Sequence, residues 1–154
     1  MLNERLASWS AARSAVIGSS LGGFYATALA EQSGRSGSRV VLLNPAVSPA
    51  RDLEKYIGET SAWHSDERFF FEPRFIDELR AIAPPHLTRL THLGRYFAII
   101  AKGDEVLSWV EMSARYRGCK VKLLEGGDHA LSDFEQHLPE VMGFLGLTAR
   151  ATSG

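Results

Sequence analysis

The sequence lacks the features that mark secreted, membrane-spanning or disulfide-stabilised proteins. Its 154 residues include one cysteine, Cys119, which excludes an internal disulfide framework and a thiolate zinc site and fits a reducing cytoplasm. The first 20 residues contain no apolar stretch behind a basic start, so a secretion signal is not indicated. The longest apolar runs, such as residues 96–101, are about a third of the roughly 20 residues that cross a bilayer.

An excess of charge of either sign is also absent. The 17 Lys and Arg residues balance 18 Asp and Glu residues, which leaves a formal net charge of −1. Such a chain offers no basic surface to nucleic acid and has no acidic tail. Because 45% of the residues are hydrophobic, the composition is that of an ordinary globular protein. We therefore expect one cytoplasmic domain over residues 1–154, with neither a nucleic-acid nor a membrane partner.

Short apolar runs alternate with helical patterns along the chain. The runs occupy residues 14–18, 39–43, 96–101 and 120–124. The helical patterns occupy residues 21–32, 106–116 and 134–145. Strands that are apolar throughout and alternate with helices predict an α/β fold, with about four parallel strands covered by helices on both faces.

Residues 50–89 depart from this alternation. The interval contains three consecutive phenylalanines at 69–71, one helical pattern at 74–82 and no predicted strand. Two interpretations remain open. The interval is either a lid-like helical insertion or a long irregular crossover that covers the sheet.

A nucleophile motif follows the first apolar run. Gly18-Ser19-Ser20-Leu21-Gly22 matches the G-x-S-x-G pattern, with Ser20 at the turn between a strand and a helix. Glycines at 18 and 22 are expected to leave room for a sharply turned serine, and the backbone N–H of Leu21 would be one oxyanion donor. The motif alone is weak, because small residues are common at such turns for packing reasons.

An acid and a base follow two further strands. Asp104 comes after the third apolar run and His129 after the fourth. Since ligands bind at the carboxyl ends of parallel strands, these side chains should meet Ser20 there. The order Ser20, Asp104, His129 is that of α/β-hydrolases, in which the histidine acts as a general base and the aspartate orients it.

Other assignments of these side chains stay open. Asp104 could be a turn aspartate after a glycine, and His129 could be a loop histidine bonded to the backbone. Glu105 is the best substitute for the acid, because it is adjacent to Asp104. Asp128 and Asp133 lie so close to His129 in sequence that they are poorer candidates.

Neither a metal nor an organic cofactor is expected. The other four histidines, at positions 64, 86, 92 and 137, show no metal-ligand spacing. Cys119 has no partner base nearby in the sequence, so we interpret it as structural. A serine nucleophile with a histidine base requires no cofactor.

Taken in order, the motifs resemble the YqiA-like family of small bacterial esterases in the α/β-hydrolase superfamily. The matching blocks are GSSLGGFYAT at 18–27, LNPAV at 43–47, YIG at 56–58, GDEVL at 103–107, EGGDHA at 125–130 and FLGL at 144–147. The resemblance implies an α/β-hydrolase fold that acts on short acyl esters or thioesters. It places the catalytic triad on Ser20, Asp104 and His129.

The sequence departs from this family before residue 14. Family members begin with a strand and a His-Gly loop that supplies the second oxyanion N–H, and this sequence has neither, so we expect a truncated α/β-hydrolase fold. Loss of one oxyanion donor lowers kcat by about 10²–10³-fold. Residues 14–18 would also become a bare apolar edge, able to pair with a second copy.

Two hypotheses of different class follow. The first is a serine carboxylic ester hydrolase (EC 3.1.1.-) that cleaves short-chain esters or thioesters through an acyl-enzyme. The second is a catalytically impaired remnant of such an esterase, which would act at most as a partner-binding domain.

Overall fold

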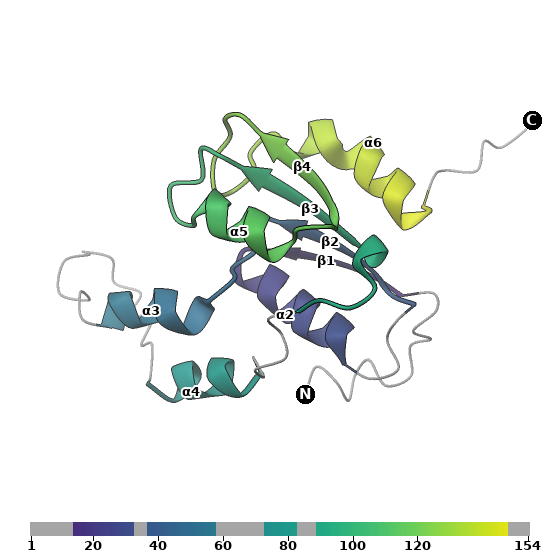
Figure 1. Ribbon diagram of the computed structural model, residues 1–154. Helices are drawn as coiled ribbons and strands as arrows, with labels where there is room; N and C mark the ends of the chain where they lie inside the picture. Colours follow the sequence, from purple (N-terminus) through teal and green to yellow (C-terminus); the bar gives the residue numbers. More distant parts are fainter. Residues whose placement is uncertain (1–13, 33–36, 58–72, 83–88, 148–154) are drawn as a thin grey trace, which may run out of the picture.

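The structure is a computed structural model that describes residues 14–32, 37–57, 73–82 and 89–147 (Figure 1). Its centre is a four-stranded sheet in the order β1-β2-β3-β4. The strands are β1 (Ala15–Ser19), β2 (Arg39–Leu43), β3 (Tyr96–Ala101) and β4 (Lys120–Leu124). All neighbouring pairs are parallel, so the four carboxyl ends share one edge of the sheet. The α/β fold predicted from the sequence is confirmed.

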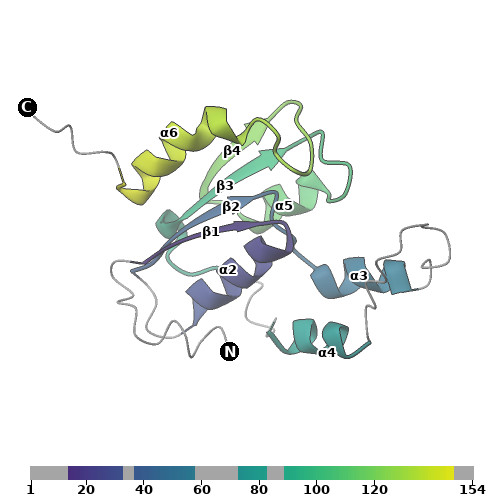
Figure 2. The same cartoon turned by 180° about the vertical axis from the view of Figure 1, so that it is seen from behind.

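Helices lie on both faces of this sheet. They are α2 (Leu21–Glu31), α3 (Pro49–Ile57), α4 (Pro73–Ile82), α5 (Trp109–Arg115) and α6 (Phe134–Leu145), with a 3-10 turn η3 (Leu93–Arg95) before β3. Helices α2 and α5 cover one face and α6 covers the other (Figures 1 and 2). Among the helices of the described ranges, none is long and apolar enough to cross a membrane.

The two central strands explain the continuous apolar runs. In β2, Val40 and Leu42 pack toward α2 and α5, whereas Val41 and Leu43 pack toward α6. All six residues of β3 are fully buried (0% exposed). A strand covered on both faces needs an apolar side chain at every position, and alternation is therefore lost.

The outer strands are less covered than the sequence analysis expected. Ile17 in β1 is 48% exposed, and Val121 and Leu123 in β4 are each 38% exposed. Within the described ranges, the helices cover both faces most fully over β2 and β3. The apolar runs at 14–18 and 120–124 are therefore not fully buried, although their composition suggested that they would be.

Helix α5 begins three residues later than predicted, at Trp109. The carboxylate of Asp104 accepts hydrogen bonds from the backbone N–H groups of Val106 and Leu107, each at 2.8 Å, and holds them in a turn. Ser108 then caps the helix. An aspartate that binds the N–H groups of the following residues offers the backbone an alternative to the helix.

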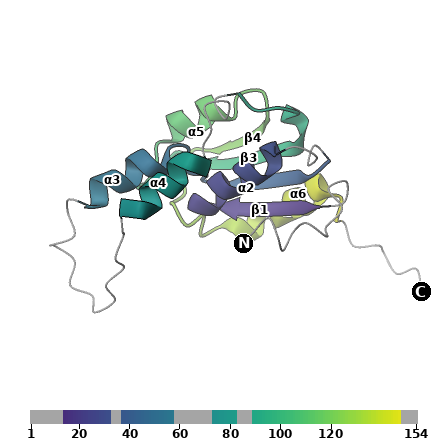
Figure 3. The ribbon, with the colours of Figure 1, turned by 90° about the horizontal axis from the view of Figure 1, so that it is seen from below.

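The described parts of the 50–89 interval are helical. The helix predicted at 74–82 is confirmed as α4, whereas α3 was not predicted. Figure 3 shows α3 and α4 side by side, beyond the ends of the strands. The phenylalanines at 69–71 lie outside the described residues, and the choice between a lid and a crossover within one domain stays a prediction.

We predict that the chain associates through β1, which in the described part of the sheet pairs only with β2. The backbone groups of Ser14 and Ser20 form hydrogen bonds with β2. Along a parallel strand, every second residue bonds to the same neighbouring strand. The backbone N–H and C=O groups of Ile17 therefore face the open edge of the sheet. Ile17→Lys should therefore shift size-exclusion elution toward the monomer, because a charge at an edge opposes pairing.

Val110→Lys is the matched control for this test, because Val110 is 57% exposed on α5, a helix that packs on β3. Its elution should equal that of the unchanged chain. A single monomeric species of the unchanged chain at every concentration would contradict association through β1.

Candidate active site

Ser20 lies on a strained turn between β1 and α2. Its backbone angles, φ 51° and ψ −121°, are rarely adopted by a residue other than glycine and cost about 1–3 kcal/mol. The turn is held by the end of β2: the Ser20 N–H donates to Leu43 O (2.9 Å), and the Ser20 carbonyl accepts from the N–H of Ala46 (2.9 Å). These bonds fix the serine at the carboxyl edge of the sheet.

Close contacts explain two of the three glycines around Ser20. A Cβ on Gly18 would lie 2.4 Å from the carbonyl oxygen of Gly22, and a Cβ on Gly23 would lie 2.6 Å from Pro45 Cβ. A Cβ on Gly22 would meet no described atom within 4 Å. The expectation that Gly22 supplies clearance is therefore wrong for the described residues, because its carbonyl, not its Cα hydrogen, approaches Gly18.

The imidazole of His129 bridges Ser20 and Asp104. Its Nε2 lies 2.9 Å from Ser20 Oγ, and its Nδ1 lies 2.9 Å from Asp104 Oδ2. The His129 side chain is 22% exposed and the Asp104 side chain is fully buried. With an ionised aspartate, Nδ1 carries the proton and donates it, which leaves Nε2 to accept from the serine hydroxyl. The structure thus brings the three predicted residues together.

The other acids near His129 have different partners. The Glu105 carboxylate accepts from the main-chain N–H of the histidine (3.1 Å), so it contacts the loop and not the ring. Asp128 accepts from the Ser132 N–H and hydroxyl (2.9 and 2.6 Å), and these hydrogen bonds lower its pKa. Asp133 lies 3.3 Å from His137. Of the acids considered from the sequence, Asp104 is the one on the imidazole.

Leu21, the predicted oxyanion residue, opens helix α2. The first N–H groups of a helix have no acceptor within the helix, and the helix dipole is positive there. The Leu21 side chain packs against a cluster of Phe24, Ala46 and Leu79, together with Ala50, Leu53 and Leu107. An oxyanion role for the N–H of Leu21 stays a prediction. The side chains packed around Leu21, next to the serine, are apolar.

Sequence reasoning missed one side chain at this edge. Asn44, noted from the sequence only within the LNPAV block, is fully buried and hydrogen-bonded both to the end of β3 and to the loop that carries His129. The sequence did hold a signal for this role, because Asn44 follows the end of β2 just as Asp104 follows the end of β3.

A family model described as an uncharacterised protein family (UPF0227) matches residues 2–146. The chain belongs to this family. Membership confirms the resemblance to YqiA-like proteins inferred from the motifs.

Solved structures of three other proteins share the fold of this UPF0227 chain. A candidate hydrolase from Agrobacterium vitis S4 has a TM-score of 0.61 at 16% identity, over 92% of this chain and 64% of that protein. A hydrolase from Pseudomonas aeruginosa PA01 has a TM-score of 0.61 at 19% identity, with coverages of 94% and 69%. Acetyl xylan esterase 1 from Thermoanaerobacterium sp. JW/SL YS485 has a TM-score of 0.56 at 19% identity, with coverages of 96% and 50%. The chain therefore spans between half and about two thirds of the length of these proteins.

Metal-binding groups and reactive thiols do not mark a second site in the described ranges. No three His, Cys, Asp or Glu side chains of those ranges are grouped to hold a metal ion. Burial raises the pKa of the Cys119 thiol to about 11, so little thiolate forms at neutral pH.

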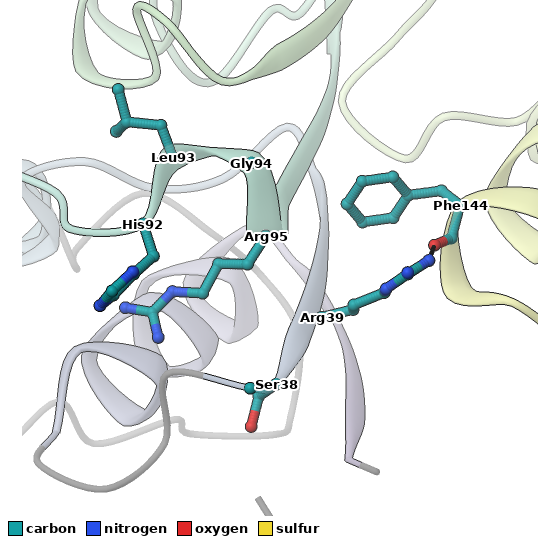
Figure 4. A pocket seen from close by; sticks show the side chains of 8 residues that line it. Ser38, Arg39, His92, Leu93, Gly94, Arg95 and Phe144 are labelled. Atoms are coloured by element: carbon teal, nitrogen blue, oxygen red, sulfur yellow. Dashed lines mark hydrogen bonds between the residues drawn. The ribbon is translucent and has the colours of Figure 1, made fainter. Parts of the chain in front are cut away.

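A separate pocket of about 540 Å³ lies at the amino ends of β2 and β3, lined by residues 37–39 and 92–95 and by Phe144 (Figure 4). Its cationic side chains have structural partners. Arg39 donates to the carbonyl of Phe144, and Arg95 lies 2.8 Å from the carboxylate of Glu31. The three predicted site residues are at the opposite, carboxyl edge.

The glycine contacts predict different effects for two similar substitutions. Gly18→Ala should lower the free energy of unfolding by about 1–3 kcal/mol, because the added methyl group overpacks against the carbonyl of Gly22. Gly22→Ala should be neutral or stabilise by up to about 1 kcal/mol, because the site is open and alanine favours the helix. Urea unfolding of the two variants measures both effects. Equal stabilities of the two variants would contradict this account of the turn.

Proposed function

We propose that the chain is a serine hydrolase that cleaves short-chain carboxylic esters or thioesters through an acyl-enzyme on Ser20. One observation carries the proposal: His129 lies 2.9 Å from both Ser20 Oγ and Asp104 Oδ2. Serine is a weak nucleophile until an adjacent base accepts its proton, and the base must itself be oriented. The positions of the three side chains meet both requirements.

Acylation starts when Ser20 Oγ attacks the carbonyl carbon of the ester and His129 Nε2 takes the hydroxyl proton. The new Oγ–C bond pushes an electron pair onto the carbonyl oxygen, which becomes an oxyanion. Collapse of this intermediate breaks the bond to the alkoxide or thiolate, and His129 returns the proton to that leaving group. The acyl group then remains as an ester of Ser20.

Deacylation repeats these steps with water as the nucleophile. His129 takes a proton from water while the water oxygen attacks the acyl carbon. It then returns a proton to Ser20 Oγ as the carboxylic acid leaves. Asp104 keeps the proton of the neutral ring on Nδ1 and stabilises the imidazolium in both halves of the reaction. The cycle consumes one ester and one water and needs no cofactor.

The oxyanion is assigned to the N–H of Leu21 at the start of α2. A backbone N–H at a helix N-terminus favours a developing negative charge without reorganisation of solvent. In general, a site with one such donor turns over about 10²–10³-fold more slowly than a site with two.

Apolar side chains beside the serine support an acyl substrate. Leu21, Leu53 and Leu107 are only partly buried where they pack on Phe24, so they leave apolar surface for a short hydrocarbon chain. The likeness in fold to an acetyl xylan esterase supports a small acyl group. We propose a small-molecule ester or thioester as the partner, no nucleic-acid or membrane partner, and a cytoplasmic location.

The experiment that tests this function is hydrolysis of p-nitrophenyl acetate and of a short-chain acyl thioester. We expect a burst of p-nitrophenol close to one per chain, because this good leaving group makes acylation faster than deacylation. Ser20→Ala should abolish the burst and lower kcat by about 10³-fold or more. Ser19→Ala is the matched control, because Ser19 is an exposed neighbour of the nucleophile in β1, and it should retain the burst.

Equal rates for the unchanged chain and Ser20→Ala would contradict a role for the serine. A folded chain with no activity on either substrate would instead favour the second hypothesis, an impaired relative that acts as a partner-binding domain.

A further inference from the structure

The backbone of Asn44 is fixed at the carboxyl edge of the sheet. The residue follows β2 directly, is fully buried, and donates its main-chain N–H to Ile99 O in β3 (3.0 Å). Its φ of 40° lies in the left-handed region, which asparagine and aspartate adopt more readily than other residues with a side chain. The side chain therefore leaves the end of β2 in a defined direction.

The amide of Asn44 connects the end of β3 to the loop that carries the base. Its Oδ1 accepts the N–H of Ala101 (2.8 Å), and its Nδ2 donates to the carbonyls of Asp128 (2.9 Å) and His129 (3.1 Å). Only the oxygen of an amide accepts and only its nitrogen donates, so these three contacts fix the orientation of the group.

We propose that Asn44 is a positioning residue that sets the distance between His129 and both Ser20 and Asp104. Ala101 ends the strand that leads to Asp104, and the carbonyls bound by Nδ2 belong to the loop of His129. One buried amide therefore links the end of the strand before Asp104 to the main chain of the loop that carries His129. The proposal rests on the function proposed above.

The chemistry of the contacts selects an amide at this position. One partner is a donor and two are acceptors, and a buried polar group without a partner is costly. A carboxylate of the same size would place negative charge against two carbonyl oxygens. An apolar side chain would leave all three backbone groups without this partner.

Asn44 and Asp104 act on different parts of the histidine. Asp104 bonds to the ring and sets its tautomer, whereas Asn44 bonds to the main-chain carbonyl and sets the position of the loop. The main-chain N–H of His129 donates to the carboxylate of Glu105, which is exposed to solvent. A hydrogen bond there contributes less than one in the interior. Loss of the buried contact should therefore move the loop.

The variant that isolates this role is Asn44→Asp. Aspartate has the same size, tolerates the left-handed backbone and can still accept from Ala101, but its ionised carboxylate cannot donate to the two loop carbonyls. Val141→Ala is the matched control, because Val141 is fully buried in α6, in the cluster that also contains Ala101 and Leu131, so its truncation destabilises the fold and removes no hydrogen bond. Where the buried carboxylate prevents folding, the neutral Asn44→Ser replaces it under the same criteria.

We expect Asn44→Asp to lower kcat on p-nitrophenyl acetate by about 10²-fold with little change in KM, because a small displacement of the base is felt in the chemical step. Val141→Ala should keep the kcat of the unchanged chain despite a lower melting temperature. A second readout is the NMR resonance of the His129 Nδ1 proton. It should shift or exchange away in Asn44→Asp and persist in Val141→Ala.

Unchanged kcat and an unchanged Nδ1 resonance in Asn44→Asp would overturn the positioning role. A kcat that falls equally in Val141→Ala would also overturn it, because the effect would then be one of stability. An inactive but folded unchanged chain would refute the proposed function, not this inference. The Nδ1 resonance alone would then decide the role of Asn44.

Discussion

The buried carboxylate of Asp104 is the interaction on which the site depends. A charged group without exposure to water is stable only where donors surround it, and here they are the N–H groups of Val106 and Leu107 and the ring of His129. These bonds delay the start of α5, and they hold the imidazole with its other nitrogen toward Ser20. Loop shape, helix boundary and ring orientation therefore have one electrostatic cause.

The sheet topology makes this arrangement reachable from distant parts of the sequence. Ser20 and His129 are 109 residues apart, yet both follow strands of one parallel sheet and lie at the same edge. The end of β2 adds backbone bonds to the turn of Ser20 and, through Asn44, a side chain to the loop of His129. Each strand end thus contributes one part of the site, and β2 contributes the part that holds the others in place.

The sequence predicted those features that local pattern controls. The central runs 39–43 and 96–101 were placed correctly, because burial on both faces demands continuous apolar residues. The start of α5, the openness at Gly22 and the role of Asn44 were not predicted, because each depends on a contact between a side chain and a distant or competing backbone group. Helix α3 was also missed, since its stability comes partly from packing of Ala50 and Leu53 against other elements.

The central claim is that His129 activates Ser20. Its most direct test is the intact mass of the folded chain after exposure to a fluorophosphonate, with Ser20→Ala treated in parallel. A fluorophosphonate modifies a serine only where a base has raised its nucleophilicity. We expect a single phosphonyl adduct on the unchanged chain and none on the variant. A folded chain that gains no adduct, or a variant that gains the same one, would contradict it.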